Sequence, residues 1–150
     1  AKRVGFDKVK LFDEILPRCQ DYDMCIRIAK YYDFDFVKDS LVKYQVHDNQ
    51  ISTNLSTVIK GEKKIINKYL KELEKSPIIY SEHCFFLGNK LCHAAEMREG
   101  RKYLFKAILI YPFYMKYYIY VFSSLFGARF YKFCYKIKKL LLVKSLFHER

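Results

Sequence analysis

The last third of this 150-residue sequence has almost no acidic residues. Residues 101–150 hold eleven Lys or Arg and one Glu, a net charge of +10, whereas residues 1–50 are neutral. Many of the Tyr and Phe residues lie beside this positive charge, which favours an anionic surface as a partner. No motif of an RNA-binding or DNA-binding module is present, and the lysines alternate with bulky apolar residues. We therefore expect no nucleic-acid partner.

The five cysteines contain no C-x-x-C pair, and the first residues do not form a signal peptide. An odd number of cysteines in such a chain is typical of reduced thiols in the cytosol. The pairs His83-Cys84 and Cys92-His93 lack the spacing of a zinc site on a helix, and we expect them to be core residues. With 51% hydrophobic and 18% aromatic residues, the chain can bury a core.

The sequence has no internal repeat, and from residue 55 onward its apolar residues recur with helical spacing. Prolines and glycines divide this region. The pattern predicts helices over 55–75, 78–98 (ended by Gly100), 101–111, 112–126 (ended by Gly127) and 128–147.

The first 54 residues have a mixed pattern. Residues 19–32 (CQDYDMCIRIAKYY) predict a helix with Asp21 and Asp23 in its first turn, where the helix dipole favours anions. Two short runs rich in β-branched and aromatic residues, 34–37 and 41–47, predict strands, and Ser52 or Asn54 is a candidate cap for the next helix.

The chain therefore divides at about residue 54. Two short strands are too few to form an independent sheet, so we interpret residues 1–54 as the end of a larger α/β domain and residues 55–150 as a helical tail. The predicted fold class is an α/β fragment followed by an all-helical region, predominantly α overall.

Two segments together resemble the second half of a family 2 glycosyltransferase catalytic domain. They are LFDEILPRCQDYDMCIRIAK, residues 11–30, and LVKYQVHDNQIS, residues 41–52. The resemblance implies a GT-A fold (an α/β sandwich with a nucleotide-sugar site) whose nucleotide-binding half lies outside this chain. It covers residues 4–54 well and the helical tail only loosely.

The resemblance also implies roles for four residues. Asp21 would be the general base that deprotonates the acceptor hydroxyl in an inverting reaction. Gln20 and Asp23 would help to bind the acceptor, and His47 would help to hold a divalent metal, Mn²⁺ or Mg²⁺, on the donor diphosphate. From the residues alone, Asp21 could instead cap the helix, and His47 could be a strand-end histidine bonded to the backbone. We expect Arg27 to be a structural partner of a helix-start carboxylate or a loop carbonyl rather than a substrate ligand.

The sequence departs from the family pattern at several positions. Gln20 stands where glutamate is commoner, Lys10 where glycine is usual, and Gln45 where arginine is frequent. Glycine at position 10 would let the backbone approach a ligand closely. The letters Asp-x-Asp occur at 21–23 and 33–35, on or just after the predicted helix, whereas the family's metal-binding Asp-x-Asp precedes this region by many residues. No Asp-x-Asp precedes the region among the 150 residues.

The basic tail carries an apolar stripe on residues 128–147, with its lysines on another face. A basic amphipathic helix of this kind suits an anionic membrane surface, although it could also pack on its own bundle. Residues 107–127 contain Lys116, and we expect them to lie in the headgroup plane rather than to cross the bilayer. The stripe consists of Phe130, Phe133, Cys134, Ile137, Leu140 and Leu141.

The resemblance, together with the basic tail, implies a fragment of a bacterial glycosyltransferase that would be inactive alone. The full enzyme would transfer a sugar from a nucleotide-sugar donor to a saccharide or lipid-linked acceptor in surface polysaccharide synthesis. It would lie in the cytoplasm, peripheral to the inner face of the plasma membrane. The alternative is a non-enzymatic helical module that docks to a membrane or partner, with Asp21 and His47 in no shared cleft.

Overall fold

The computed structural model describes residues 8–39, 41–43 and 54–148, with side chains described up to residue 137. All the regular structure in these residues is helical, in seven helices beyond a short turn at residues 8–9. The chain divides into two compact units, Ala1–Lys68 and Tyr69–Arg150.

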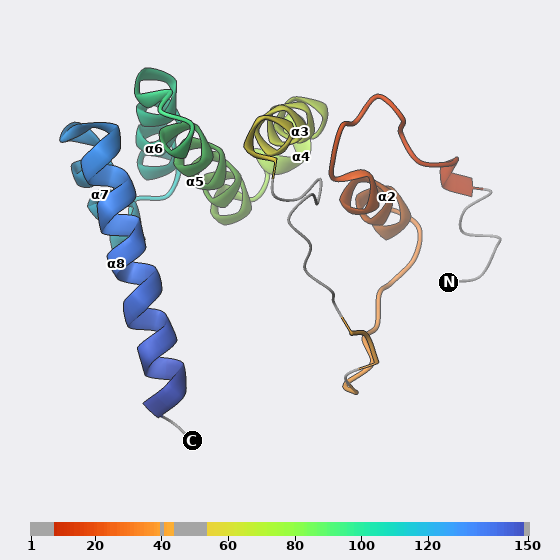
Figure 1. Cartoon of the computed structure of the whole chain (residues 1–150). Coiled ribbons are helices and arrows are strands. Elements are labelled where there is room, and N and C mark those ends of the chain that lie inside the picture. Colours follow the sequence, from red (N-terminus) through yellow and green to blue (C-terminus); the bar gives the residue numbers. More distant parts are fainter. Residues whose placement is uncertain (1–7, 40, 44–53, 149–150) are drawn as a thin grey trace. The chain divides into compact units, whose positions relative to one another are not determined.

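The first unit contains α2 (Gln20–Ala29) and α3 (Leu55–Lys68) (Figure 1). The predicted cap of α3 is confirmed, because the Asn54 side-chain oxygen accepts a hydrogen bond of 3.2 Å from the Thr57 amide. Val9, Leu16 and Met24 are buried in the segment before and within α2, as are four apolar residues of α3: Val58, Ile59, Ile65 and Ile66.

The α/β prediction is wrong. Residues 34–37 form no strand, residues 41–43 form none, and 44–47 lie outside the described residues. Phe34, Phe36 and Val37 are exposed, and no other strand in the described part of the chain offers them a ladder of hydrogen bonds. A β-branched and aromatic run becomes a strand only when a neighbouring strand and a buried face are available.

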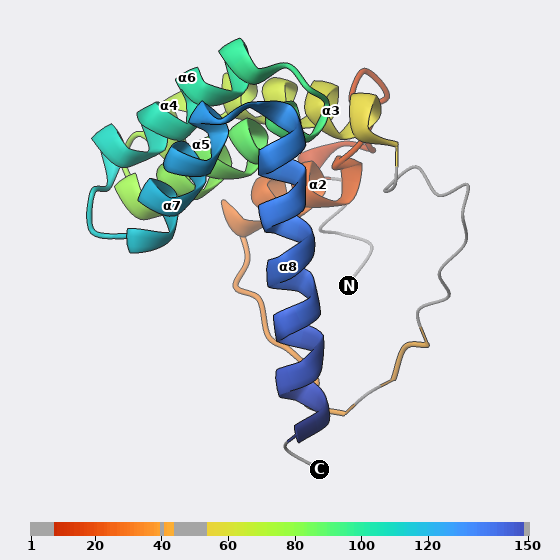
Figure 2. The same cartoon turned by 60° about the vertical axis from the view of Figure 1, so that its left-hand side comes forward.

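The second unit contains five helices, which are α4 (Leu70–Leu73), α5 (Pro77–His93), α6 (Met97–Ile110), α7 (Met115–Leu125) and α8 (Gly127–His148). Helices α5 and α6 pack together closely, α7 packs on α6, and α8 packs on α7 and α5. The C-terminal part of α8 extends away from α5, α6 and α7 (Figure 2). The buried core of this unit includes Cys92, Leu104, Val121 and Tyr131.

Two helix ends differ from the sequence prediction. The helix expected over 55–75 is interrupted at Tyr69, and α5 ends at His93 rather than near Gly100. Gly100 lies inside α6, where a Cβ would be 2.5 Å from the Cys92 sulfur and 3.0 Å from the Gly88 carbonyl oxygen. This glycine is therefore required by the close crossing of α5 and α6 and does not end a helix.

Candidate functional site

Helix α2 begins at a backbone turn and has no side-chain cap. Cys19, the residue before the helix, adopts a left-handed conformation with φ 66°, and its side chain accepts no capping hydrogen bond. Asp21 and Asp23 both lie in the first turn, as predicted, where their charges interact favourably with the exposed amides of the helix start.

The two aspartates have opposite environments. Asp21 is exposed, whereas the side chain of Asp23 is 0% exposed. Two residues of an α-helix turn through about 200°, so these side chains leave α2 on nearly opposite sides. Gln20 is also exposed, and its side-chain amide donates a hydrogen bond of 2.9 Å to the Leu16 carbonyl oxygen.

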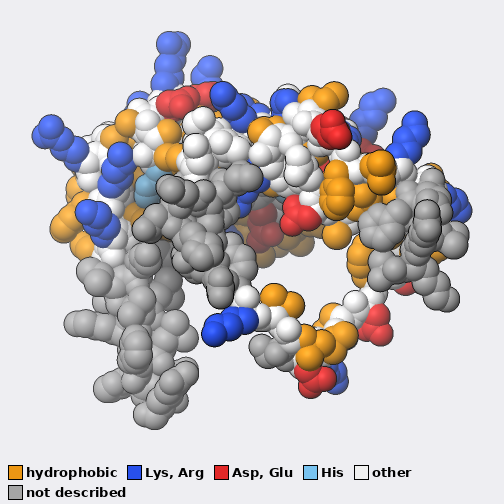
Figure 3. All heavy atoms as spheres, turned by 45° about the vertical axis from the view of Figure 1, so that its right-hand side comes forward, with side chains coloured by type: hydrophobic (Ala, Val, Ile, Leu, Met, Phe, Trp, Pro, Cys, Tyr) orange, Lys and Arg blue, Asp and Glu red, His pale blue; other side chains and the backbone are white. Residues whose placement is uncertain are grey.

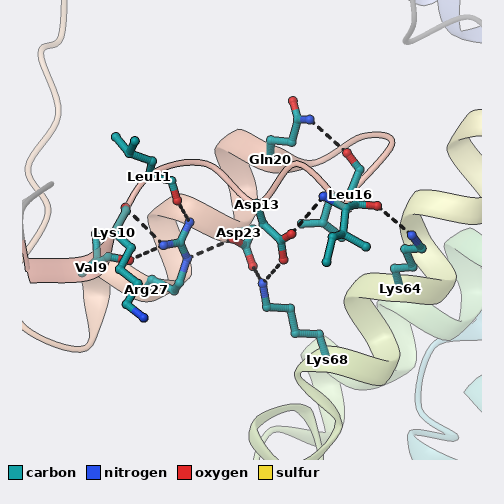
Figure 4. Close-up of polar contacts among 11 residues, drawn as sticks. Val9, Lys10, Leu11, Asp13, Leu16, Gln20, Asp23, Arg27, Lys64 and Lys68 are labelled. Carbon is teal, nitrogen blue, oxygen red and sulfur yellow. Dashed lines mark hydrogen bonds and ion pairs between the residues drawn. The ribbon is translucent and has the colours of Figure 1, made fainter.

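Asp23 is held by two cations, one on each carboxylate oxygen (Figure 4). Arg27 Nε donates to Asp23 Oδ2 at 2.9 Å from the next turn of α2, and Lys68 Nζ lies 2.6 Å from Asp23 Oδ1 at the end of α3. A buried carboxylate is stable only when it is paired and hydrogen-bonded in this way. Asp23 therefore fixes α2 to α3.

Arg27 also fixes the loop that precedes α2. Its guanidinium donates to the carbonyl oxygens of Val9, Lys10 (3.3 Å) and Leu11 (3.0 Å) as well as to Asp23 (Figure 4). Within this loop Lys10 has φ 65°, a conformation that favours glycine. Position 10 is glycine in the family that the sequence resembles, and the backbone here is left-handed at this position although the residue is a lysine.

Lys68 bridges Asp23 and Asp13. Its ammonium lies 2.6 Å from Asp13 Oδ2, and Asp13 Oδ1 accepts a hydrogen bond of 3.1 Å from the Ile15 amide. The hydrogen bond from Lys68, and then the one from Ile15, lower the pKa of the Asp13 carboxyl. Partial burial works to lower the pKa of Lys68, but hydrogen bonds to Asp13 and Asp23 outweigh it and the net shift is upward.

An open hollow of about 780 Å³ lies beside this network. Its wall combines the cations Lys10, Arg27 and Lys68 with the carboxylate of Asp13 and an apolar patch formed by Val9, Leu11 and Phe12. Such a wall has the chemistry to accept a ligand with both an anionic and an apolar part. Gln20 and Asp21 do not line it, and Asp23 contacts two of its lining residues.

The structure thus brings together only some of the predicted site residues. Gln20, Asp21 and Asp23 share the start of α2, while His47 lies outside the described residues. Among the residues that the structure describes, no three His, Cys, Asp or Glu side chains gather as metal ligands. The roles assigned to Gln20, Asp21, Asp23 and His47 remain predictions.

Sequence reasoning gave Arg27 a structural role beside a carboxylate or loop carbonyl, and its hydrogen bonds confirm that role. Lys68 was missed entirely. It lies 55 residues from Asp13 in a helix with two other exposed lysines, Lys60 and Lys64, and no local pattern separates it from them. Only the tertiary structure shows its pairing with two aspartates.

Among the described residues, no helix combines the length and the apolar character that a bilayer crossing needs.

The sequence is partly similar to a known protein. Over 82 residues, or 55% of this chain, the sequence is 30% identical to an uncharacterized glycosyltransferase of Rickettsia bellii (strain RML369-C). The chain spans 12% of the length of that relative. No family model matches the sequence, and no solved structure matches it. The comparisons thus show a distant, partial relation to a glycosyltransferase.

Proposed function

We propose that this chain is part of an inverting, family 2-like glycosyltransferase and carries the base that activates the acceptor. The observation that supports this most is the partial similarity to a glycosyltransferase, together with the acidic start of α2 in a segment that resembles that family. By itself the chain would be inactive, since the nucleotide-sugar donor would bind mainly to residues outside it.

In this proposal Asp21 takes the proton of the acceptor hydroxyl. The hydroxyl oxygen attacks the anomeric carbon of the donor sugar, the nucleoside diphosphate leaves from the opposite face, and the configuration inverts. The exposure of Asp21 suits this role, since an acceptor can reach its carboxylate. The amide of Gln20, in the same turn, would bind another acceptor hydroxyl.

Asp23 would support the site from within. Its ion pairs with Arg27 and Lys68 fix the start of α2, and therefore the position from which Asp21 projects. His47 is the residue that we assign to a divalent metal, Mn²⁺ or Mg²⁺, which would offset the charge of the leaving diphosphate. The described residues supply no further set of metal ligands.

The proposal is tested on the protein encoded by the whole open reading frame in which this sequence lies. Release of nucleoside diphosphate from a panel of nucleotide sugars is measured with bacterial membranes as the source of acceptor. We expect release by the wild type and a fall of about 10²–10⁴-fold in Asp21→Asn, the range of a lost general base. Asp35→Asn, another exposed carboxylate of the same unit, is the control that should stay active.

From the tail we infer the acceptor, a saccharide or a lipid-linked saccharide used in surface polysaccharide synthesis at the inner face of the plasma membrane. The basic charge of residues 101–150 would hold the enzyme there. If no nucleotide sugar is consumed and Asp21→Asn changes nothing, the second candidate is favoured. It is a non-enzymatic docking module, which the all-helical structure of the described residues would also suit.

A further inference from the structure

Helix α7 has a buried face and an exposed apolar face. Tyr117, Val121 and Ser124 are buried in the second unit, and Tyr117 exchanges a hydrogen bond of 3.0 Å with Ser81 of α5. A second row of residues at helical spacing is large, apolar and exposed; it consists of Met115, Ile119 and Phe122. The helix therefore presents a complete apolar stripe that its own unit does not cover.

The first turns of α8 are divided in the same way. Tyr131 is buried and donates a hydrogen bond of 3.0 Å to Asn89 of α5. Burial raises the pKa of its hydroxyl, which keeps the group protonated as a donor. Phe130 and Phe133 lie on the exposed side. Phe130 and Phe133, two members of the predicted apolar stripe, thus face away from the buried Tyr131.

Ring contacts join the two exposed stripes across the bend between α7 and α8. The ring centroids of Phe122 and Phe126 are 5.1 Å apart, and those of Phe126 and Phe130 are 5.0 Å apart. Gly127, with φ 89°, makes the bend between them. We call the resulting set the phenylalanine surface; it consists of Met115, Ile119, Phe122, Phe126, Phe130 and Phe133.

Single exposed apolar side chains are ordinary, but a contiguous set of this size marks a binding surface. The positive charge beside the phenylalanine surface indicates that its partner is anionic. Arg129, Lys132 and Lys136 are exposed on the same helix, and no acidic residue occurs between residues 100 and 148 of the sequence. In Figure 3 lysine and arginine side chains lie among hydrophobic ones over much of the visible described surface.

We infer that the phenylalanine surface inserts into the headgroup region of an anionic bilayer, with the basic side chains of α8 on the lipid phosphates. Aromatic and apolar side chains beside a basic face are typical of helices that lie in the membrane plane. This inference rests on the membrane part of the proposed function and locates it on residues, at the α7–α8 bend. It does not depend on transferase activity.

The first test is flotation of the 150-residue chain with vesicles of phosphatidylcholine, alone or with 30% phosphatidylglycerol. The test variant is Phe122→Ser/Phe126→Ser, whose rings are 62% and 58% exposed. The matched control is Phe34→Ser/Phe36→Ser, whose rings are 59% and 77% exposed in the first unit. Circular dichroism checks that both variants keep the wild-type helix content.

We expect the wild type to bind the anionic vesicles and to be released at 1 M salt, where charges are screened within about 3 Å. The test variant should bind at least about tenfold more weakly, since burying one phenylalanine already corresponds to about that factor. Arg129→Gln/Lys132→Gln should lose about fivefold per charge. The control should bind like the wild type.

A second test uses the absence of tryptophan from the sequence. Phe126→Trp gives a chain with one tryptophan, whose emission should shift to the blue and be quenched by brominated lipid, while Phe36→Trp should show neither change. Three results would overturn the inference: no binding to anionic vesicles, equal loss in test and control variants, or an unchanged Phe126→Trp spectrum. A wild-type dimer that Phe122→Ser/Phe126→Ser converts to a monomer would also overturn it, because a second copy would then cover the surface.

Discussion

Replacing Asp23 with asparagine tests the ion-pair network that fixes the start of α2. The substitution keeps the shape of the side chain but removes the charge that pairs with both Arg27 and Lys68. Removing one partner of a fully buried pair costs about 3–5 kcal/mol. Because Arg27 and Lys68 are partly exposed and water can solvate them, we expect a smaller cost of about 2 kcal/mol.

The assay is amide hydrogen exchange of peptides that cover α2 (Gln20–Ala29), read by mass spectrometry. Exchange in α2 reports on the opening of the first unit alone, so the result can be interpreted even if the two units unfold separately. A loss of about 2 kcal/mol corresponds to exchange about 30-fold faster in this helix.

The matched control is Asp21→Asn, the same substitution two residues away on the exposed side of α2. At this exposed position the interaction of the Asp21 charge with the helix start is worth only about 0.3 kcal/mol, so exchange in this variant should stay within about twofold of the wild type. Equal exchange in Asp23→Asn and the wild type would refute the network, as would equal acceleration in both variants.

Three further changes have expected outcomes. Gly100→Ala should destabilise the second unit by about 1–3 kcal/mol in urea unfolding, because its Cβ would lie 2.5 Å from the Cys92 sulfur; a neutral effect would contradict the close crossing of α5 and α6. Lys10→Gly should stabilise the first unit by about 0.5 kcal/mol, because relief of the strained left-handed backbone outweighs the entropy that glycine adds to the unfolded chain. Slower amide hydrogen exchange in peptides of the loop before α2 would show this, and faster exchange would contradict it. Burial, and then the charges of Lys90 and Lys132, lower the pKa of His93, so the folded state favours the neutral ring. The stability that His93 contributes is therefore present above pH 6.5, the ordinary pKa of histidine, and is lost as the pH falls below it. The melting temperature of the second unit should fall between pH 7 and pH 5, and His93→Phe should flatten that dependence; an equally steep fall in the variant would contradict it.

The helices were largely predictable because each one carries its own periodic pattern and boundary residues. The Asn54 cap and the acidic start of α2 were found from single residues whose effect is local. Gly100 was misread because a glycine that ends a helix and a glycine that permits a helix crossing look the same in sequence. The strands were wrong because their formation depends on a partner strand, which residues 34–37 do not have in the described structure.

The site was only partly predictable for a similar reason. The acidic start of α2 marks a candidate site, but the sequence cannot say which carboxylate is buried. That depends on Lys68, which reaches Asp13 and Asp23 from another helix. The apolar stripe of α8 was predictable from its periodicity, whereas the junction of its exposed Phe130 with α7 depends on the ring contacts through Phe126 and Phe122.

The central claim is a division of roles between two aspartates of α2, one for chemistry and one for structure. It is tested most directly by measuring nucleoside diphosphate release and α2 exchange on Asp21→Asn and Asp23→Asn in the protein of the whole reading frame. The account predicts that Asp21→Asn keeps wild-type exchange and loses at least about 100-fold in rate, while Asp23→Asn exchanges about 30-fold faster. An Asp21→Asn protein with the wild-type rate would contradict it.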